Sequence, residues 1–151
     1  MDQAAASTSD GTSRVLCRLG VLLILLGLAT GAAIPLFDDA RRGLAAHTAG
    51  VQNGMLLTVL GLLWGRLRLT PALARITAVA GVFSLYAIWL AFVLAAIFGT
   101  GAAAPAAGAG HGPDAWPRSL VAIVRGAGSV ALLAALLAAL WGLRPRRSPS
   151  E

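Results

Sequence analysis

The sequence predicts an all-α integral membrane protein, a bundle of four transmembrane helices. Hydrophobic residues make up 58% of the 151 residues and charged residues 12%, and the mean hydropathy of +0.79 is far above that of ordinary soluble domains. The apolar residues gather in four runs, each with about the 20 residues that a helix needs to cross about 30 Å of hydrocarbon. The runs lack the alternation of apolar and polar residues that is typical of membrane-spanning β-strands. They are therefore predicted to be helices, which satisfy all backbone hydrogen bonds within the segment in lipid.

The predicted spans follow one another along the chain, at residues 19–37, 44–64, 76–98 and 119–143. Pro71 is expected to open the third helix, because proline is tolerated in a first helical turn. The third connection, Gly99 to Pro117, is rich in Gly, Ala and Pro and is expected to be a flexible cap. His111 lies in this cap and is expected to be an exposed loop residue.

The two ends of the chain differ from the spans in composition. Residues 1–14 are expected to form a disordered tail and residues 144–151 a basic tail, which leaves the transmembrane domain at residues 15–143. Small residues after the first apolar run also occur in cleaved signal peptides. That run is too long for a signal peptide, and its leader carries acidic rather than basic residues, whereas a signal peptide begins with basic residues. A membrane span is therefore favoured.

The charge pattern predicts the orientation in the membrane. All the basic residues are arginines, twelve in number, and the net charge is +6. Such a charge suggests nucleic-acid binding in a soluble protein, but here topology explains it, and no nucleic-acid partner is expected. Eight arginines fall on one side of the predicted membrane and four on the other, where three aspartates accompany them. By the positive-inside rule both termini face the cytoplasm, as expected for a bacterial inner-membrane protein.

The second span carries polar residues in an apolar setting, within the stretch AHTAGVQNGM. On a helix that turns about 100° per residue, His47, Gly50 and Gly54 fall on one face with almost no bulk. A flat guest molecule or a neighbouring backbone could lie against this face. Asn53 lies on its flank, about 9 Å further along the axis than His47. Gln52 points elsewhere, and the sequence suggests no role for it beyond a hydrogen bond between helices.

Two interpretations of His47 and Asn53 stay open on residue types alone. Polar side chains in membrane bundles often hydrogen-bond between helices, but they also mark functional sites, because they are costly in lipid. A zinc or di-iron site needs three or more His, Cys or carboxylate ligands, and the spans hold one histidine and no carboxylate. The single cysteine, Cys17, excludes an intrachain disulfide and an iron-sulfur cluster. A single histidine can still be the proximal ligand of a haem.

A stripe of small residues runs along the first span. Gly27 and Gly31 form a GxxxG motif, and Gly20 lies one heptad before Gly27. Such a stripe lets another helix approach closely. The motif therefore predicts helix packing but names no particular partner.

The longer run AHTAGVQNGMLLTVLGLLWGRLRL resembles the second-helix signature of small membrane isomerases, the family of styrene-oxide isomerase and hydroxylaminobenzene mutase. The shared elements are Ala46-His47, Gly50 and Asn53-Gly54-Met55. The resemblance implies a homotrimer of four-helix subunits with haem b near the subunit interfaces. His47 would be the axial ligand of the iron, with Gly50 and Gly54 also expected to bind the cofactor. Asn53 would face the open position and orient a small aromatic substrate.

The family implies a redox-neutral isomerase in which iron acts as a Lewis acid. Epoxide isomerases convert an epoxide into an aldehyde, and the mutases move the oxygen of an N-hydroxyl group to the aromatic ring. The run NGMLLTVLGLLWGRLRL is closer to the mutase branch, so hydroxylaminobenzene mutase-like chemistry is expected. Epoxide isomerisation is the alternative, followed by a b-type cytochrome, which usually needs two axial ligands, or a non-catalytic membrane scaffold.

Phe92, Tyr86 and Arg125 bear on what this resemblance implies. Epoxide isomerases carry a pocket tyrosine at a position that falls on Phe92 here. The nearest tyrosine, Tyr86, lies about 120° away around the helix and is expected either to act in catalysis or to sit at the membrane interface. Arg125 lies about two turns into the fourth run. It is expected either to snorkel to the interface or to bind a haem propionate on the side of His47.

Overall fold

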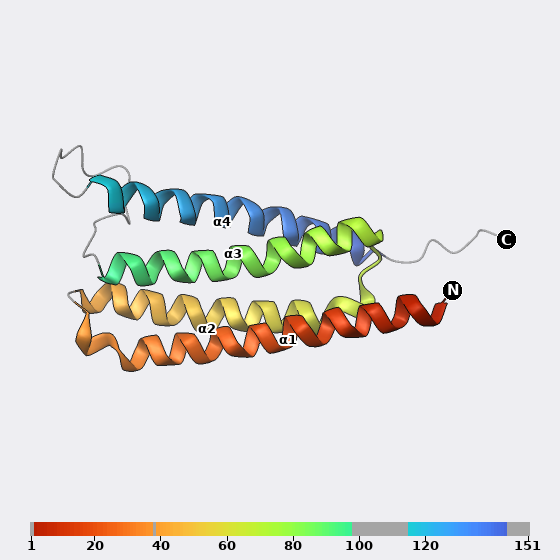
Figure 1. The fold of residues 1–151 in the computed structure, drawn as a ribbon, viewed down its shortest axis with the longest axis horizontal. Coiled ribbons are helices and arrows are strands. Elements are labelled where there is room, and N and C mark those ends of the chain that lie inside the picture. Colours follow the sequence, from red (N-terminus) through yellow and green to blue (C-terminus); the bar gives the residue numbers. More distant parts are fainter. Residues whose placement is uncertain (1, 38, 98–114, 145–151) are drawn as a thin grey trace.

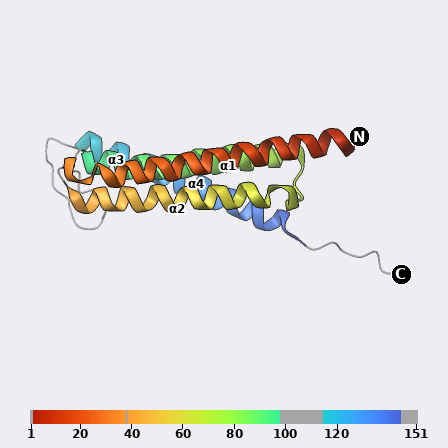
Figure 2. The same ribbon diagram turned by 90° about the horizontal axis from the view of Figure 1, so that it is seen from below.

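The computed structural model describes residues 2–37, 39–97 and 115–144, except the side chains of 2–8 and 115–118, and the regular secondary structure of this part is entirely helical. Four long helices lie side by side and alternate in direction (Figure 1). They are α1 (Asp2–Ala32), α2 (Ala40–Leu63), α3 (Pro71–Ile97) and α4 (Ala115–Gly142). The 3-10 turns η1 (Ile34–Leu36) and η2 (Trp64–Arg66) follow α1 and α2. The chain therefore starts and leaves the bundle at the same end, as seen from two directions (Figures 1 and 2).

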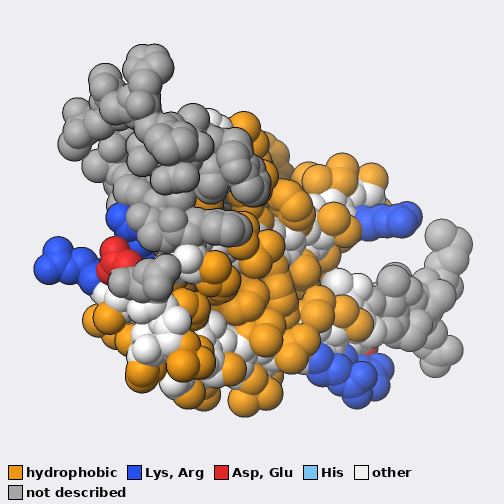
Figure 3. All heavy atoms as spheres, turned by 60° about the vertical axis from the view of Figure 1, so that its left-hand side comes forward, with side chains coloured by type: hydrophobic (Ala, Val, Ile, Leu, Met, Phe, Trp, Pro, Cys, Tyr) orange, Lys and Arg blue, Asp and Glu red, His pale blue; other side chains and the backbone are white. Residues whose placement is uncertain are grey.

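Three of the described helices are long and apolar enough to cross a membrane, namely Ser9–Ala32, Pro71–Ile97 and Ser119–Gly142. The helix α2 is not among them, because polar side chains lower its hydropathy. Many large apolar side chains point outward; Leu62 is 70% exposed and Val130 71% exposed. Hydrophobic side chains cover the middle of the face in Figure 3, and arginines lie toward its ends. This surface suits lipid better than water.

The ends of the helices differ from those expected from sequence. α1 already begins at Asp2, so it includes the segment that was expected to be a disordered tail. Within that segment, Ser13 Oγ donates a hydrogen bond of 2.7 Å to the Gly61 carbonyl of α2. α1 ends at Ala32 rather than at residue 37, because Pro35 has no backbone N–H to continue the ladder. The expected start of the third helix at Pro71 is confirmed.

The side chain of Asp39 sets the start of α2. Its carboxylate accepts hydrogen bonds from the backbone N–H groups of Arg41 and Arg42, at 3.0 and 3.2 Å. It also pairs with the Arg42 guanidinium at 3.1 Å. An aspartate at the N-cap satisfies free donors of the first turn. The helix therefore begins at Ala40, before the apolar run that predicted its start at residue 44.

Helices α1 and α2 form the closest pair in the bundle, and glycines make their approach possible. A Cβ atom added to Gly27 would lie 2.7 Å from the Val51 backbone nitrogen and 2.8 Å from the Gly50 carbonyl carbon. A Cβ added to Gly54 would lie 2.6 Å from the Gly20 carbonyl oxygen. Backbone thus contacts backbone along this interface. The predicted role of the glycine stripe in helix packing is confirmed, and its partner is α2.

Candidate functional site

His47 lies near the start of α2 and points toward α1. Its Nδ1 is 2.9 Å from the Gly27 carbonyl oxygen, and a Cβ at Gly31 would come within 2.6 Å of that nitrogen. Because a carbonyl oxygen can only accept, Nδ1 of the neutral ring carries the hydrogen and Nε2 keeps its lone pair. The side chain is half-buried. His47 is therefore oriented by a backbone carbonyl in the manner of a metal-binding histidine.

Gly50 and Gly54 do not offer an open face. A Cβ at Gly50 would lie 2.6 Å from the Gly27 Cα atom and 2.8 Å from Trp89 Cδ1. A Cβ at Gly54 would lie 2.6 Å from Ile24 Cγ1. A neighbouring helix, and not a flat guest, fills the space that these glycines leave. Both glycines therefore serve helix packing, and the cofactor-binding role expected for Gly50 and Gly54 stays a prediction.

Asn53 points from α2 toward α3, on a different flank from His47. Its Nδ2 donates a hydrogen bond of 2.9 Å to the Leu85 carbonyl oxygen, and the side chain is half-buried. His47 and Asn53 each bond to the backbone of a neighbouring helix, as the structural interpretation of polar residues predicted. In Asn53, this bond holds the amide in place and leaves Oδ1 as an acceptor.

Trp89 of α3 is a neighbour of this region that the sequence did not reveal. Its indole Nε1 is buried and has no hydrogen-bond partner among the described residues. The indole contacts Gly50, which lies one turn after His47 and one turn before Asn53. A buried donor without an acceptor costs free energy, so its presence indicates a binding or structural role. No sequence pattern shows that residue 89 faces residue 50, because this requires the register of α2 against α3.

Tyr86 ties α3 to α1. Its hydroxyl donates a hydrogen bond of 2.8 Å to the Leu19 carbonyl oxygen, and its half-buried ring packs against the core around Leu16, Leu23 and Leu57. The single hydroxyl hydrogen is therefore already engaged. On this geometry we assign Tyr86 to helix packing. The roles expected from the sequence, in catalysis or at the membrane interface, stay predictions.

We expect Tyr86→Phe to lower the free energy of unfolding by about 1 kcal/mol, the net contribution of a typical hydrogen bond, and to leave isomerase activity within about twofold of wild type. Thermal unfolding and turnover in detergent measure the two effects. A loss of activity in a variant with normal stability would show that Tyr86 takes part in the reaction.

Phe92 and Gln52 line a shallow groove on the outer flank of α2. The groove has a volume of about 420 Å³ and is also lined by Arg41, Leu44, Ala45, Thr48 and Ala49. Phe92 is the position at which a pocket tyrosine is expected in epoxide isomerases. The structure thus brings this position to the same groove as Gln52, for which the sequence suggested only a hydrogen bond between helices.

Arg125 lies on α4, which packs mainly against α3. Its side chain is half-buried, and its carbonyl accepts a hydrogen bond from Ser129 Oγ at 2.9 Å. α3 lies between α4 and α2 (Figure 1), so Arg125 belongs to a different part of the bundle from His47, although at the same end. His111 lies outside the described residues. In the described part of the chain, no group of three His, Cys, Asp or Glu residues could hold a metal ion.

A sequence model described as styrene oxide isomerase matches residues 12–144. The chain belongs to the styrene oxide isomerase family. It is also 40% identical, over 91% of its length and 85% of the relative, to hydroxylaminobenzene mutase HabB of Ectopseudomonas oleovorans. It is 43% identical to hydroxylaminobenzene mutase HabA of the same organism, over 61% of this chain and 69% of the relative. No solved structure matches the chain. Membership of the family makes this protein an isomerase, as the resemblance in the second helix implied.

Proposed function

We propose that this isomerase converts an aryl hydroxylamine into an aminophenol, moving the hydroxyl oxygen from nitrogen to the aromatic ring. The observation that carries the proposal is the 40% identity to a hydroxylaminobenzene mutase over 91% of the chain. The rearrangement is redox-neutral, so it needs no external electron donor or acceptor. A small aromatic substrate also suits the apolar surroundings of His47 and Asn53.

A haem b bound through His47 is the cofactor that we propose. His47 fits this role, because the Gly27 carbonyl holds the hydrogen on Nδ1 and leaves the Nε2 lone pair for a metal. The chain offers no complete set of side-chain ligands in its described part, which suits an iron held mainly by a porphyrin. When bound, the iron supplies Lewis-acid activation of a substrate oxygen or nitrogen.

Asn53 is the residue to which we assign substrate orientation. The bond from its Nδ2 to the Leu85 carbonyl fixes the amide plane, so that Oδ1 can accept a hydrogen bond from the N–H or O–H of a hydroxylamine. The buried Trp89 Nε1 provides a second, still unpaired donor close by. The reaction would also need water to be excluded from the site, because water would otherwise capture a cationic species during the rearrangement.

The assembly that we propose is a homotrimer of four-span subunits in a bacterial inner membrane, with α2 as the fourth span. The outward apolar side chains and the alternating helix directions support insertion. α2 carries the polar residues that lower its hydropathy, and contacts with α1 and α3 shield several of them from lipid. The arginine-rich end, with both termini, would face the cytoplasm.

Incubation of the purified protein with hydroxylaminobenzene tests the proposed function, with aminophenol formation as the readout. We expect Asn53→Ala to lower turnover by about a hundredfold, an effect typical of a lost group that stabilises the transition state, and to keep the haem absorption. Asn53→Asp keeps an oxygen that can accept a hydrogen bond from the substrate, but it loses the Nδ2 donor to the Leu85 carbonyl. This variant therefore separates the effect of holding the side chain in place from the effect of accepting the substrate's hydrogen bond. Normal turnover in Asn53→Ala would exclude this role.

Epoxide isomerisation is the second candidate, because the family model that matches the chain is that of styrene oxide isomerase. Phe92 lacks the hydroxyl expected in the pocket of such enzymes and favours the mutase reaction. Incubation of the same preparation with styrene oxide compares the two activities directly. We expect hydroxylaminobenzene to be the better substrate.

A further inference from the structure

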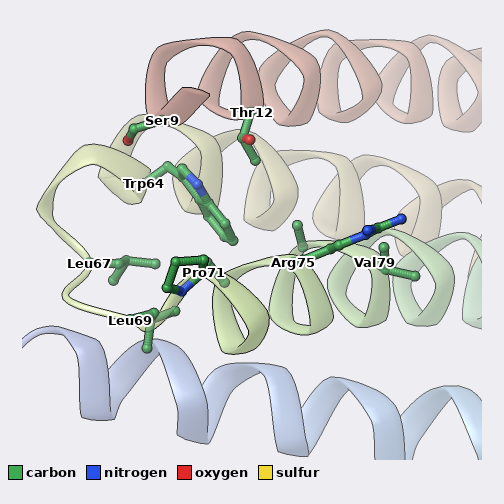
Figure 4. A pocket seen from close by; sticks show the side chains of 10 residues that line it. Ser9, Thr12, Trp64, Leu67, Leu69, Pro71, Arg75 and Val79 are labelled. Atoms are coloured by element: carbon green, nitrogen blue, oxygen red, sulfur yellow. The ribbon is translucent and has the colours of Figure 1, made fainter. Parts of the chain in front are cut away.

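A second cavity lies at the arginine-rich end of the bundle, away from His47. It has a volume of about 680 Å³, within the range of small-molecule sites, and is enclosed by α1, η2, the following loop and the start of α3 (Figure 4). Its lining residue Thr12 and the His47 partner Gly27 are fifteen residues apart on α1, about 22 Å along the helix. The cavity is therefore separate from the proposed active site.

The cavity has an apolar wall and a polar rim. Trp64, Leu67 and Leu69 form one side, and the α3 residues Ala74, Ala78 and Val79 form another. Ser9 and Thr12 contribute hydroxyl groups from α1. Arg75 extends along α3 toward Val79 in Figure 4. An apolar surface that continues into hydroxyl and guanidinium groups is complementary to an amphiphile with an anionic head.

The charge around the cavity favours an anion. Arg75 is exposed and forms no ion pair with a described residue; the ion pair between Asp39 and Arg42 lies at the other end of the bundle. Further arginines lie at this end on α1, η2 and the following loop, and at the end of α4: Arg14, Arg18, Arg66, Arg68 and Arg144. The described acidic residue at this end is Asp10 on α1. The local charge is thus positive, and a guanidinium binds phosphate through paired N–H donors.

We propose that this cavity binds an anionic phospholipid. Its phosphate would lie at Arg75, on the polar rim of the cavity, and the first part of an acyl chain would lie against Trp64 and the small residues of α3. The three helices that are long and apolar enough to span a membrane bring the cavity within reach of a bilayer surface. Free phosphate would leave the apolar wall in water, and a neutral aromatic substrate would leave Arg75 without a partner.

Quenching of tryptophan fluorescence by brominated lipids tests the proposal, because Trp64 is 6% exposed and lines the cavity. The full-length protein is reconstituted in phosphatidylcholine vesicles that contain brominated phosphatidylglycerol or brominated phosphatidylcholine. The Trp64→Phe variant gives the signal of the other tryptophans, which is subtracted. We expect half-quenching of Trp64 at an about fivefold lower mole fraction of the anionic lipid, corresponding to one arginine contact.

Two matched variants separate the cavity from general surface charge. Arg75→Gln should abolish the preference for the anionic lipid, whereas Arg66→Gln removes the same charge from an exposed residue outside the lining and should retain it. Ala78→Phe keeps every charge but fills the cavity, so it should also reduce quenching of Trp64. Circular dichroism confirms that each variant is folded.

Three results would overturn the proposal. Equal quenching of wild-type Trp64 by the two lipids would mean that the headgroup is not recognised. Equal losses in Arg66→Gln and Arg75→Gln would assign the preference to diffuse surface charge. Relief of quenching by millimolar inorganic phosphate would make the site one for free anions. None of these measurements uses isomerase turnover, and the two lipids are compared on one protein preparation, so bound haem would lower the tryptophan signal equally in both.

Discussion

His47→Ala is expected to abolish the Soret absorption of the purified protein and to lower isomerase turnover by at least about a hundredfold. The substitution removes the only imidazole of the described helices, and the proposed iron has no other protein ligand. The absorption spectrum of detergent-purified protein and the rate of aminophenol formation measure the two effects. Added imidazole should restore part of the absorption, because it can occupy the space that the side chain leaves.

Thr48→Ala is the matched control for this variant. Thr48 is the next residue on α2, is exposed, and donates its hydroxyl to the Leu44 carbonyl at 2.9 Å within the same helix. It should retain the wild-type spectrum and turnover. A colourless wild-type protein after expression with ample haem, or an unchanged Soret band in His47→Ala, would contradict the proposed ligand.

Gly27→Ala is expected to lower the free energy of unfolding by about 2 kcal/mol, the middle of the range for overpacked sites. The new methyl would lie 2.7 Å from the Val51 nitrogen and 2.8 Å from the Gly50 carbonyl carbon. Both are backbone atoms, so only separation of α1 from α2 makes room. The measurement is thermal unfolding in detergent, in which the midpoint should fall by several degrees.

The same substitution should alter the haem spectrum, because the Gly27 carbonyl orients His47. Gly126→Ala on α4 is the control, since a Cβ there meets nothing within 4 Å. In a helix interior, alanine is more stable than glycine by about 0.5–1 kcal/mol, so this variant should be unchanged or slightly more stable. Equal stability of Gly27→Ala and Gly126→Ala would refute the close packing of α1 on α2.

The polar stretch of α2 shows how far the sequence predicted the site. Its spacing placed His47 on the face of Gly50 and Gly54 and Asn53 on the flank of that face, and in the structure the two side chains contact different helices, α1 and α3. The spacing could not decide whether a cofactor or a helix lies against the face of Gly50 and Gly54, because the space left by a glycine can be filled by either. The unpaired Trp89 N–H and the bond from Tyr86 to Leu19 depend on how α3 lies against its neighbours.

The sequence by itself determined the all-helical class, the number of long helices, the start of α3 at Pro71 and the family, since these follow from local composition and a contiguous motif. Only the tertiary structure decided which groups meet. Gly27 became the orienting partner of His47, and the residues of the anionic-lipid cavity came together from α1, η2 and α3. Such contacts join residues far apart in the chain, and their register depends on side-chain packing across whole helices, which no local pattern encodes.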